Sequence, residues 1–479
     1  MSNLVDEKLK EHFTKMSVFK GANKALFASC SIPSYIRDWF LMRYEDKDGH
    51  VDEDFVAGRL YDIVPRREEW LQRLDRLMNF GEEQKFLGKL KVKLNIKDNE
   101  IYFELPDFEI SFKDTLIERD VWYKIKNDSL AGEEEVCGVV TLGYGPYKKT
   151  NKIMLKDFKV FRPYNINLEY YREARKNFTF DEWLSVLLGA MDYNAEGYPT
   201  LEGKLEMLKR LLPFVEKRPN LIELAPKGTG KSYVFSQISK YGWLNSGGVM
   251  SRAKLFYDMS KHQVGLIGNY DFVVLDEIST IRFTDIEEMQ GSLKGFLESG
   301  TFAVGTKKGT SDAGMVFMGN IKQSNMNVQL NMFQELPSLF NDPALLDRIH
   351  GFIQGWRIPR MDEKMKMHGW ALNSEYFSEI LHELREDSTY YSLVSKLAIY
   401  SSGDTRDINA VLKIATALVK LLFPHWQNEE DVNKEEFEKY CLNPAIEMRQ
   451  IIKTQLGIMD EEYRNKAFPE FKVKAENLL

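Results

Sequence analysis

The sequence predicts an α/β fold, with a parallel sheet and flanking helices in the middle of the chain. Three observations lead to this prediction. From about residue 200 to residue 360, short apolar strands alternate with helical segments, which is the pattern of a parallel sheet. A glycine-rich loop follows the first of these strands and leads into a helix. A later apolar strand ends in two acidic residues.

Composition excludes several classes of protein. Of the 479 residues, 43% are apolar and 29% are charged, which excludes collagen-like, disordered and disulfide-rich chains. The net charge of −7 means that nucleic-acid binding would have to come from a local basic patch. Cys30, Cys137 and Cys441 lie far apart, which indicates reduced thiols in a cytoplasmic protein, without a zinc site or disulfide framework. A signal peptide and an apolar run of about 18 residues are both lacking, so no membrane association is expected.

The segments before the central sheet change from helical to β-rich. Residues 89–96 alternate polar and apolar side chains, which predicts a half-buried strand, and 97–100 read as a polar turn. Thr179 and Glu182 form a capping box ahead of a helix. Helices are predicted at 5–13, 35–44, 66–77 and 183–191, and further strands at 101–105, 108–112, 136–142 and 153–161. The predicted domains are an N-terminal helical domain (1–87), a β-rich, barrel-like domain (88–163), a helical linker (164–200), the sheet domain (201–361) and a C-terminal helical lid and extension (362–479).

The glycine-rich loop has the spacing of a phosphate-binding loop. An apolar strand at 221–224 precedes it and a helix at 233–239 follows. The pattern G-x-x-x-x-G-K-[ST] is met except that Ala225 replaces the first glycine. In such a loop, backbone N–H groups and the helix start hold the phosphates, the lysine reaches the β- and γ-phosphates, and the hydroxyl binds Mg²⁺. The residues predicted to bind the nucleotide are Pro226, Lys227, Gly228, Thr229, Gly230, Lys231 and Ser232.

The strand that ends in two acidic residues supports this interpretation. Phe272 to Leu275 is apolar, and Asp276 and Glu277 follow. In a nucleotide hydrolase Asp276 would hold Mg²⁺ and Glu277 would act as general base toward water. Asn320 ends another apolar strand and would orient that water; the alternative is an ordinary turn asparagine. Together the motifs predict a nucleotide hydrolase that uses Mg²⁺.

Two arginines are further candidates for catalysis. Arg348 follows an apolar pair, and as an arginine finger it would stabilise transition-state charge on a neighbouring subunit's nucleotide. The alternative for Arg348 is a surface salt bridge with Asp347 or Asp342. Arg406 begins a C-terminal helix and would reach the γ-phosphate from a lid; a capping-region ion pair is its alternative.

In their order along the chain, these motifs resemble those of AAA+ ATPases, which implies ATP and Mg²⁺ as cofactors. The residues would be Walker A (Lys231), Walker B (Asp276 and Glu277), sensor 1 (Asn320), arginine finger (Arg348) and sensor 2 (Arg406). More narrowly, residues 223–232, with 246–248 and 403–407, resemble the Lon-like BrxL family of bacterial BREX phage-defence systems. The resemblance extends from the N-terminal helices to about Pro424.

The resemblance implies several properties. Family members are expected to form AAA+ rings, as hexamers or stacked hexamers, that bind DNA and act with other BREX proteins to block phage replication. Their core is similar to MCM helicases, with a β-barrel domain before the ATPase, and the DNA-binding β-rich segment 88–163 stands at that place. The segment after Pro424 is short for a Lon-type protease domain and shows no Ser–Lys pair, so protease activity is not expected.

Two lysine clusters are candidates for DNA contact. Lys307 and Lys308 lie in a predicted turn, 306–313, between strands at 300–305 and 314–318, where MCM-type ATPases carry a pore hairpin. A ring would repeat them into a basic collar that follows phosphates. A solvated hairpin tip is the alternative. The second cluster is Lys148, Lys149 and Lys152, beside Tyr144 and Tyr147, a composition that suits single-strand stacking but equally an ordinary soluble loop.

Three functions fit the sequence. The first is a DNA-binding ATPase of phage defence that couples hydrolysis to DNA encirclement or translocation. The second is a Lon-like protein unfoldase that works with a separate protease, and the third is a nucleotide-gated assembly scaffold. Polypeptide-pulling rings usually carry an aromatic residue in the pore loop, and the predicted tip at Lys307 and Lys308 has none. This favours the first function over the second, whereas the third differs only in turnover rate.

Overall fold

The computed structural model describes residues 2–21, 33–46, 51–65, 69–95, 99–125, 135–260 and 262–474. These residues form two compact units, each with its own core. The larger unit contains the described residues of 1–21, 33–38 and 166–479, and the smaller unit contains those of 39–165. The smaller unit is therefore inserted between two segments of the larger one.

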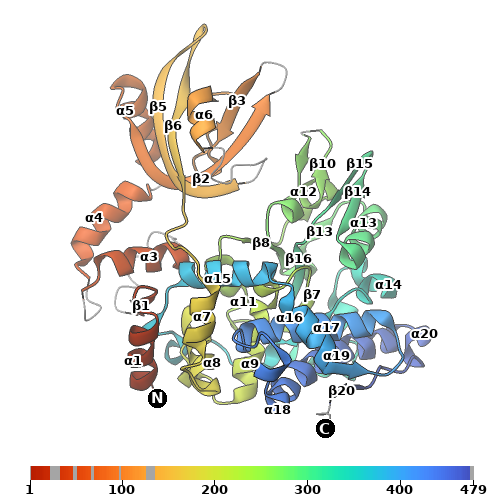
Figure 1. The fold of residues 1–479 in the computed structure, drawn as a ribbon. Helices are drawn as coiled ribbons and strands as arrows, with labels where there is room; N and C mark the ends of the chain where they lie inside the picture. Colours follow the sequence, from red (N-terminus) through yellow and green to blue (C-terminus); the bar gives the residue numbers. More distant parts are fainter. Residues whose placement is uncertain are drawn as a thin grey trace. The chain divides into compact units, whose positions relative to one another are not determined.

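A parallel sheet of five strands is the centre of the larger unit, as predicted (Figure 1). Its strands are β7 (Asn220–Ala225), β8 (Gly242–Ser246), β12 (Phe272–Asp276), β16 (Gly314–Asn320) and β17 (Gly351–Gln354), in the order β17-β7-β16-β12-β8. The strands are apolar almost throughout because helices cover both faces of a parallel sheet. In the register, Asn320 lies opposite Ala225 and Asp276 opposite Ser246, so the motif-bearing strands end at one edge.

Helices on both faces of this sheet build the core. On one face, α13 (Ile286–Ser299) and α19 (Asn443–Met459) share an apolar cluster with β7, β12 and β16. On the other face, Phe214 of α10 (Leu212–Val215) packs against Phe235 of α11 (Lys231–Gln237) and Phe272 of β12. This packing holds the strand ends, and the motifs that follow them, in a rigid frame.

The N-terminal segment belongs to the larger unit and is not part of a separate helical domain of residues 1–87. After α1 (Ser2–His12), strand β1 (Ser17–Lys20) pairs antiparallel with β18 (Gly369–Leu372). The buried ammonium of Lys20 forms ion pairs with Asp38 and Asp192, at 3.0 Å each. A buried charge has to be paired, so these acceptors fix β1 in the larger unit.

The other elements of the larger unit surround the sheet. Before it come α7 (Leu168–Arg175), α8 (Phe180–Ala190) and α9 (Leu201–Leu208), and α8 begins with the predicted capping box of Thr179 and Glu182. Between its strands lie β9 (Val249–Met250), α12 (Arg252–Leu255), β10 (Tyr257–Asp258), β11 (Gln263–Val264), β13 (Arg282–Phe283), β14 (Thr301–Val304), β15 (Lys307–Thr310) and α14 (Pro343–Leu346).

The C-terminal part is mainly helical, as predicted. It contains α15 (Ser374–Glu386), α16 (Thr389–Leu397), α17 (Thr405–Leu422), α18 (Lys434–Phe437), α20 (Glu461–Arg464) and the strand pair β19 (Ala398–Tyr400) and β20 (Phe471–Val473). Within the ranges described above, no helix is both long enough and apolar enough to span a membrane.

The smaller unit contains a closed β-barrel. Its strands are β2 (Gln84–Asn95), β3 (Glu100–Glu104), β4 (Thr115–Ile117), β5 (Glu135–Tyr147) and β6 (Thr150–Val160), in the order β2-β3-β4-β6-β5. The barrel thus begins before the predicted boundary at residue 88. Its core includes Phe86, Phe103 and Leu155. The helices of this part are α4 (Glu53–Ile63), α5 (Trp70–Asn79) and α6 (Arg119–Ile125); α3 (Ser34–Tyr44) leads into it from the larger unit.

The predicted strand at 108–112 was wrong. Pro106 to Phe108 form a 3-10 turn, and Glu109 follows with a φ of +56°. Proline has no N–H to donate to a strand ladder, and the left-handed backbone of Glu109 turns the chain away. Of the predicted turn at 97–100, Lys97 and Asp98 lie outside the described residues.

We predict that Gly138→Ala destabilises the barrel by about 1–3 kcal/mol, the usual cost of overpacking. A Cβ on Gly138 would lie 2.5 Å from the carbonyl oxygen of Lys159 on the neighbouring strand. Hydrogen exchange of the β5 and β6 amides measures this local free energy. Gly145→Ala is the matched control on the same strand, because a Cβ there meets no atom within 4 Å. Equal exchange rates in the two variants would contradict the close packing of β5 on β6.

Candidate functional site: a nucleotide pocket at the strand ends

The glycine-rich loop between β7 and α11 has the backbone that its glycines permit. Gly228 has a φ of +84° and Gly230 a φ of +73°, in the left-handed region that residues other than glycine rarely adopt. A Cβ on Gly230 would also lie 2.5 Å from the hydroxyl of Tyr193. Both the positive φ and the lack of space for a Cβ therefore require glycine at position 230.

A buried ion pair fixes the position of the loop. Arg210 donates two hydrogen bonds to the carboxylate of Glu223 on β7, at 2.6 and 3.0 Å, and neither side chain is exposed. The same guanidinium donates to the carbonyl oxygen of Thr229 at 2.8 Å. Arg210 thus connects the strand before the loop with the loop itself. Its planar group suits this bidentate contact, which lysine could not reproduce.

Four predicted residues meet at the carboxyl edge of the sheet. The ammonium of Lys231 donates to Oδ1 of Asn320 at 2.9 Å. The hydroxyl of Ser232 donates to Oδ2 of Asp276 at 2.5 Å. Burial lowers the pKa of Lys231, while Glu223 and Asp276 favour its charged form. These two hydrogen bonds therefore connect the start of α11 with the ends of β16 and β12.

The oxygen atoms at this edge suit a Mg²⁺ ion. Ser232 and Asp276 supply the hard oxygen ligands that Mg²⁺ prefers. Within the described ranges, no group of three or more His, Cys, Asp or Glu residues is placed to hold a metal ion by itself. A Mg²⁺ ion here would need phosphate and water as its other ligands, which fits a site for a nucleotide complex.

Glu277 lies directly after the metal-binding candidate Asp276. Its N–H donates to Oδ1 of Asp276 at 2.8 Å, and its φ is +51°. A left-handed backbone at a glutamate is unusual and is found mostly where neighbouring structure enforces it. The side chain of Glu277 is exposed to solvent.

Arg348 and Arg406 lie at the opposite edge of the sheet from the loop. The side chain of Asn220, the first residue of β7, donates to the carbonyl oxygen of Arg348 at 3.3 Å. The loop begins at the other end of that strand, about 16 Å away at roughly 3.3 Å per residue. Arg406 ion-pairs with Asp347, the neighbour of Arg348 in the chain, at 2.9 Å. Arg348 and Arg406 are thus placed together, away from the glycine-rich loop of their own chain.

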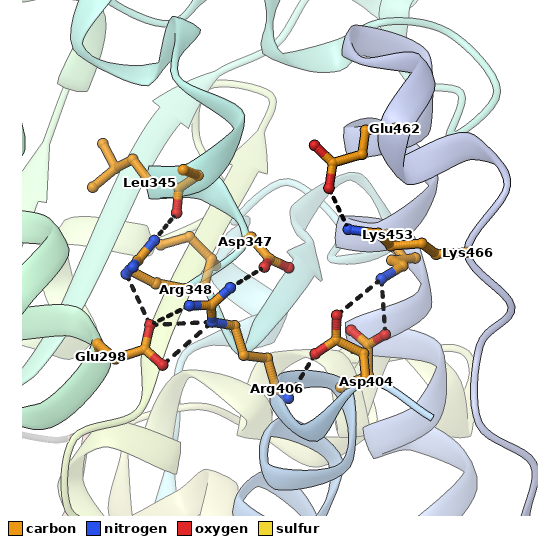
Figure 2. A network of polar contacts seen from close by, with 12 residues as sticks. Glu298, Leu345, Asp347, Arg348, Asp404, Arg406, Lys453, Glu462 and Lys466 are labelled. Atoms are coloured by element: carbon orange, nitrogen blue, oxygen red, sulfur yellow. Dashed lines mark hydrogen bonds and ion pairs between the residues drawn. The ribbon is translucent and has the colours of Figure 1, made fainter. Parts of the chain in front are cut away.

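One glutamate binds both arginines (Figure 2). Oε2 of Glu298 lies 2.9 Å from Nε of Arg348 and 3.0 Å from Nη2 of Arg406. The hydrogen bonds that Arg406 donates to Glu298 and Asp347 raise its pKa, so it stays charged. Neither the Asp347 nor the Asp342 partner considered for Arg348 is found; Asp342 pairs with Lys294. The ion pair considered for Arg406 is present.

The predicted turn at 306–313 was wrong, because Lys307 and Lys308 lie in a strand. β14 pairs with β15, with Val304 opposite Lys307 and Ala303 opposite Lys308, so the hairpin turns at Gly305 and Thr306. The second predicted strand, at 314–318, is β16 of the central sheet. Both lysine side chains are exposed at the start of β15, next to the hairpin tip.

The second lysine cluster is partly neutralised. Lys148 forms an ion pair with Glu100, and hydrogen bonds from Lys148, Tyr102 and Tyr147 lower the pKa of Glu100 to about 2. Lys152 donates to the carbonyl oxygen of Lys113. Lys149 is exposed in the β5–β6 turn. The net positive charge of this cluster is therefore smaller than the sequence indicates.

Two family models match the chain. The model described as "Lon-like protease BrxL-like, ATPase domain" matches residues 153–469. The model described as "BREX system Lon protease-like protein BrxL N-terminal" matches residues 11–144. The chain belongs to the BrxL family. In the structure, the BrxL ATPase domain contains the parallel sheet, and the glycine-rich loop follows the end of β7.

Two BrxL relatives are similar to this chain over most of its length. It is 30% identical over 461 residues to the Lon-like protease BrxL of Escherichia coli O9:H4 (strain HS), covering 94% of this chain and 64% of the relative. It is also 30% identical over 457 residues to the Lon-like protease BrxL of Bacillus cereus (strain H3081.97), covering 91% of this chain and 64% of the relative. The chain thus spans somewhat less than two thirds of each relative's length.

The structure of this BrxL-family chain adds residues that the motifs did not indicate. Arg360 and Lys322 line a cavity of about 600 Å³ together with Pro226, Lys227 and Asn320. The N–H of Met361, next to Arg360, donates to the carbonyl oxygen of Gly228 at 2.8 Å. These cations come from segments far from the loop in sequence, and only the fold brings them to it.

We predict that Arg210→Met lowers the free energy of unfolding by about 3–5 kcal/mol, because it leaves the buried carboxylate of Glu223 without a partner. Chemical denaturation measures the change. Arg357→Met is the matched control: Arg357 pairs with Glu202 and Glu447 at 2.8 and 2.9 Å but is 29% exposed. An exposed pair contributes about 0–1 kcal/mol. Equal losses in the two variants would contradict the role of Arg210 as the support of the loop.

Proposed function

We propose that this chain is a DNA-binding AAA+ ATPase of a BREX anti-phage system, acting in the cytoplasm as a ring that couples ATP hydrolysis to DNA encirclement or translocation. The ring is a hexamer or a pair of stacked hexamers and works with other BREX proteins. The observation that carries the proposal is the division of the site: Lys231, Ser232, Asp276 and Asn320 meet at one edge of the sheet, and Arg348 and Arg406 at the other.

The residues at the carboxyl edge have defined roles in this proposal. The backbone of residues 226–232 holds the phosphates of ATP, and Lys231 balances the charge of the β- and γ-phosphates. Ser232 and Asp276 would hold Mg²⁺, which would supply charge stabilisation at the phosphates. Glu277 removes a proton from the attacking water, and Asn320 orients that water. The contact between Lys231 and Asn320 supports this arrangement, since it places the water-orienting amide beside the phosphate-binding lysine.

The position of the arginines supports assembly into a ring. Arg348 and Arg406 are about a strand's length from their own loop, so they serve a nucleotide only if it belongs to a neighbouring subunit. Arg406 would then reach the γ-phosphate of a nucleotide on a neighbouring subunit. Closed rings of identical subunits place the same two edges together at every interface. Each interface would then contain one complete site.

DNA contact is assigned to the hairpin of β14 and β15. Lys307 and Lys308 are exposed near its tip, and a ring multiplies their charge around the axis. In the barrel, Lys148 and Lys149 are both exposed in the β5–β6 turn, but Lys148 pairs with Glu100 and Lys152 donates to the carbonyl oxygen of Lys113. The hairpin is therefore the stronger of the two candidates.

The name of the relatives, Lon-like protease, favours an unfoldase as the second candidate. An unfoldase ring grips polypeptide with aromatic side chains at the pore. The hairpin tip consists of Gly305 and Thr306. The one aromatic residue of the hairpin, Phe302, lies in β14 and is buried, with 8% of its surface exposed. The hairpin chemistry thus suits phosphates better than polypeptide. A nucleotide-gated scaffold would have the same site and is distinguished by slow turnover.

We predict that Glu277→Gln binds ATP but hydrolyses it about 10²–10⁴-fold more slowly, because only the general base is lost. Lys231→Ala should lack measurable hydrolysis, because the charge that balances the phosphates is lost. Nucleotide binding by calorimetry and phosphate release separate the two effects. Loss of ATP binding in Glu277→Gln, or normal turnover in Lys231→Ala, would refute the assigned roles.

We predict that Arg348→Ala lowers turnover by about 10³-fold or more, the usual effect of losing an arginine finger. Mixing Arg348→Ala with Lys231→Ala subunits should restore part of the activity, at interfaces that pair an intact loop with an intact arginine. Phosphate release against mixing ratio is the measurement. Full-rate hydrolysis by a monomer without Arg348 would exclude a role across subunits.

We predict that replacing Lys307 and Lys308 by Ala weakens DNA binding and leaves basal hydrolysis nearly unchanged. The slope of log affinity against log salt should fall by about one for each lysine–phosphate ion pair that the substitution removes. Fluorescence anisotropy at several salt concentrations measures both. Lys15→Ala with Lys396→Ala removes the same charge from exposed positions elsewhere and serves as control. Wild-type affinity and slope in the hairpin variant would move the assignment to the cluster around Lys148.

A further inference from the structure

A single carboxylate oxygen joins the two arginines that the proposed function assigns to a neighbouring nucleotide (Figure 2). Oε2 of Glu298 forms an ion pair with Arg348, 2.9 Å from its Nε, and lies 3.1 and 3.0 Å from Nε and Nη2 of Arg406. Glu298 lies in the last turn of α13, Arg348 follows α14, and Arg406 is in the first turn of α17. Three separate elements therefore meet at one anion.

The position of this carboxylate is one that a phosphate would also occupy. Two guanidinium groups at hydrogen-bond distance from the same oxygen repel each other unless an anion lies between them. The guanidinium fork binds carboxylate and phosphate with the same geometry. Glu298 thus supplies from within the chain the charge that a γ-phosphate would bring from a neighbouring subunit.

Of the two carboxylates that hold Arg406, Glu298 is the one that can be exchanged. Asp347 is 1% exposed and is shared with the buried Arg449, which also binds Asp407 at 2.7 Å. That buried network fixes Arg406 whatever happens at its other side. Glu298 is 42% exposed, so its ion pairs are open to competition from solvent and from another anion.

We infer that Glu298 is an internal latch: it occupies the anion position between Arg348 and Arg406, and the γ-phosphate of ATP on a neighbouring subunit displaces it. The inference rests on the proposed role of these arginines across subunits. The latch competes with phosphate, so it lowers the apparent affinity for ATP by the fraction of subunits in which it is closed.

Displacement of Glu298 from the two arginines would directly affect the hairpin of β14 and β15. Glu298 is followed by Ser299 and by Gly300, which caps α13 with a φ of +75°, and β14 begins at Thr301. The N–H of Ser311, beyond the other end of the hairpin, donates to the carbonyl oxygen of Gly300 at 2.9 Å. A displaced Glu298 therefore frees the end of the helix that carries the hairpin with Lys307 and Lys308. ATP on one subunit would in this way alter the DNA-contacting segment of the next.

The test is Glu298→Gln, which keeps the shape of the side chain and removes its charge. The ATP concentration for half-maximal hydrolysis should fall about 3- to 10-fold, as expected for losing exposed ion pairs, with kcat at least equal to wild type. Glu287→Gln is the matched control, because it removes an exposed glutamate from the first turn of the same helix. It should leave the half-maximal concentration unchanged.

Hydrogen exchange gives a second readout that does not depend on turnover. In a Glu277→Gln background, which holds ATP, the amides of residues 299–304 should exchange faster after ATP is added. With Glu298→Gln present as well, they should exchange at this faster rate before ATP is added. With Arg348→Ala and Arg406→Ala, ATP should no longer change the exchange rate.

The outcomes separate the latch from the proposed function. An unchanged or raised half-maximal ATP concentration in Glu298→Gln overturns the latch alone. So does a fall in kcat as large as that of Arg348→Ala, since Glu298 would then be required to orient the arginines. Wild-type turnover in both Arg348→Ala and Arg406→Ala overturns the arginine roles in the proposed function, and the latch with them.

Discussion

The buried ion pair between Arg210 and Glu223 is the interaction on which the nucleotide pocket depends. Both groups are removed from water, so each needs the other, and their separation of 2.6 Å leaves no freedom in the relative position of β7 and the segment before it. Further hydrogen bonds of the guanidinium, to the carbonyl oxygen and the hydroxyl of Thr229, extend this constraint to the loop. A flexible glycine-rich turn is thereby held in one conformation before any phosphate arrives, which removes an ordering cost from binding.

The glycine-rich loop and the strand ending in Asp276 and Glu277 were predictable because their signals are local. An apolar strand, a turn with required glycines and a helix follow one another without interruption, and even the change at Ala225 does not obscure the pattern. The parallel sheet was predictable for the same reason, since apolar strands alternating with helices have few other solutions. The barrel strands were predictable from the alternation of polar and apolar side chains, except where Pro106 and Glu109 turn the chain.

The remaining features depend on contacts between distant residues. No periodicity relates Arg210 to Glu223, Arg360 to the loop, or Glu298 to Arg348 and Arg406. The register of the β14–β15 hairpin was missed because residues 306–313 are almost all polar or small, so that nothing in their pattern distinguishes a strand from a turn. The N-terminal segment gave a similar difficulty: β1 is short, and its partner β18 lies about 350 residues further along the chain.

The pairing of β1 with β18 has a consequence for the continuity of the backbone. The barrel-containing unit is an insertion, and the chain on both sides of it belongs to the same compact unit. The segment before the insertion is held there by the strand ladder and by Lys20, whose ammonium is enclosed by Asp38, Asp192 and the carbonyl oxygens of Gly189 and Ala190. A peptide bond cleaved inside the barrel would therefore leave two fragments that stay associated without a covalent link. The nucleotide pocket would survive such a cleavage, because the fragment that carries it retains every residue from Arg210 to Arg406.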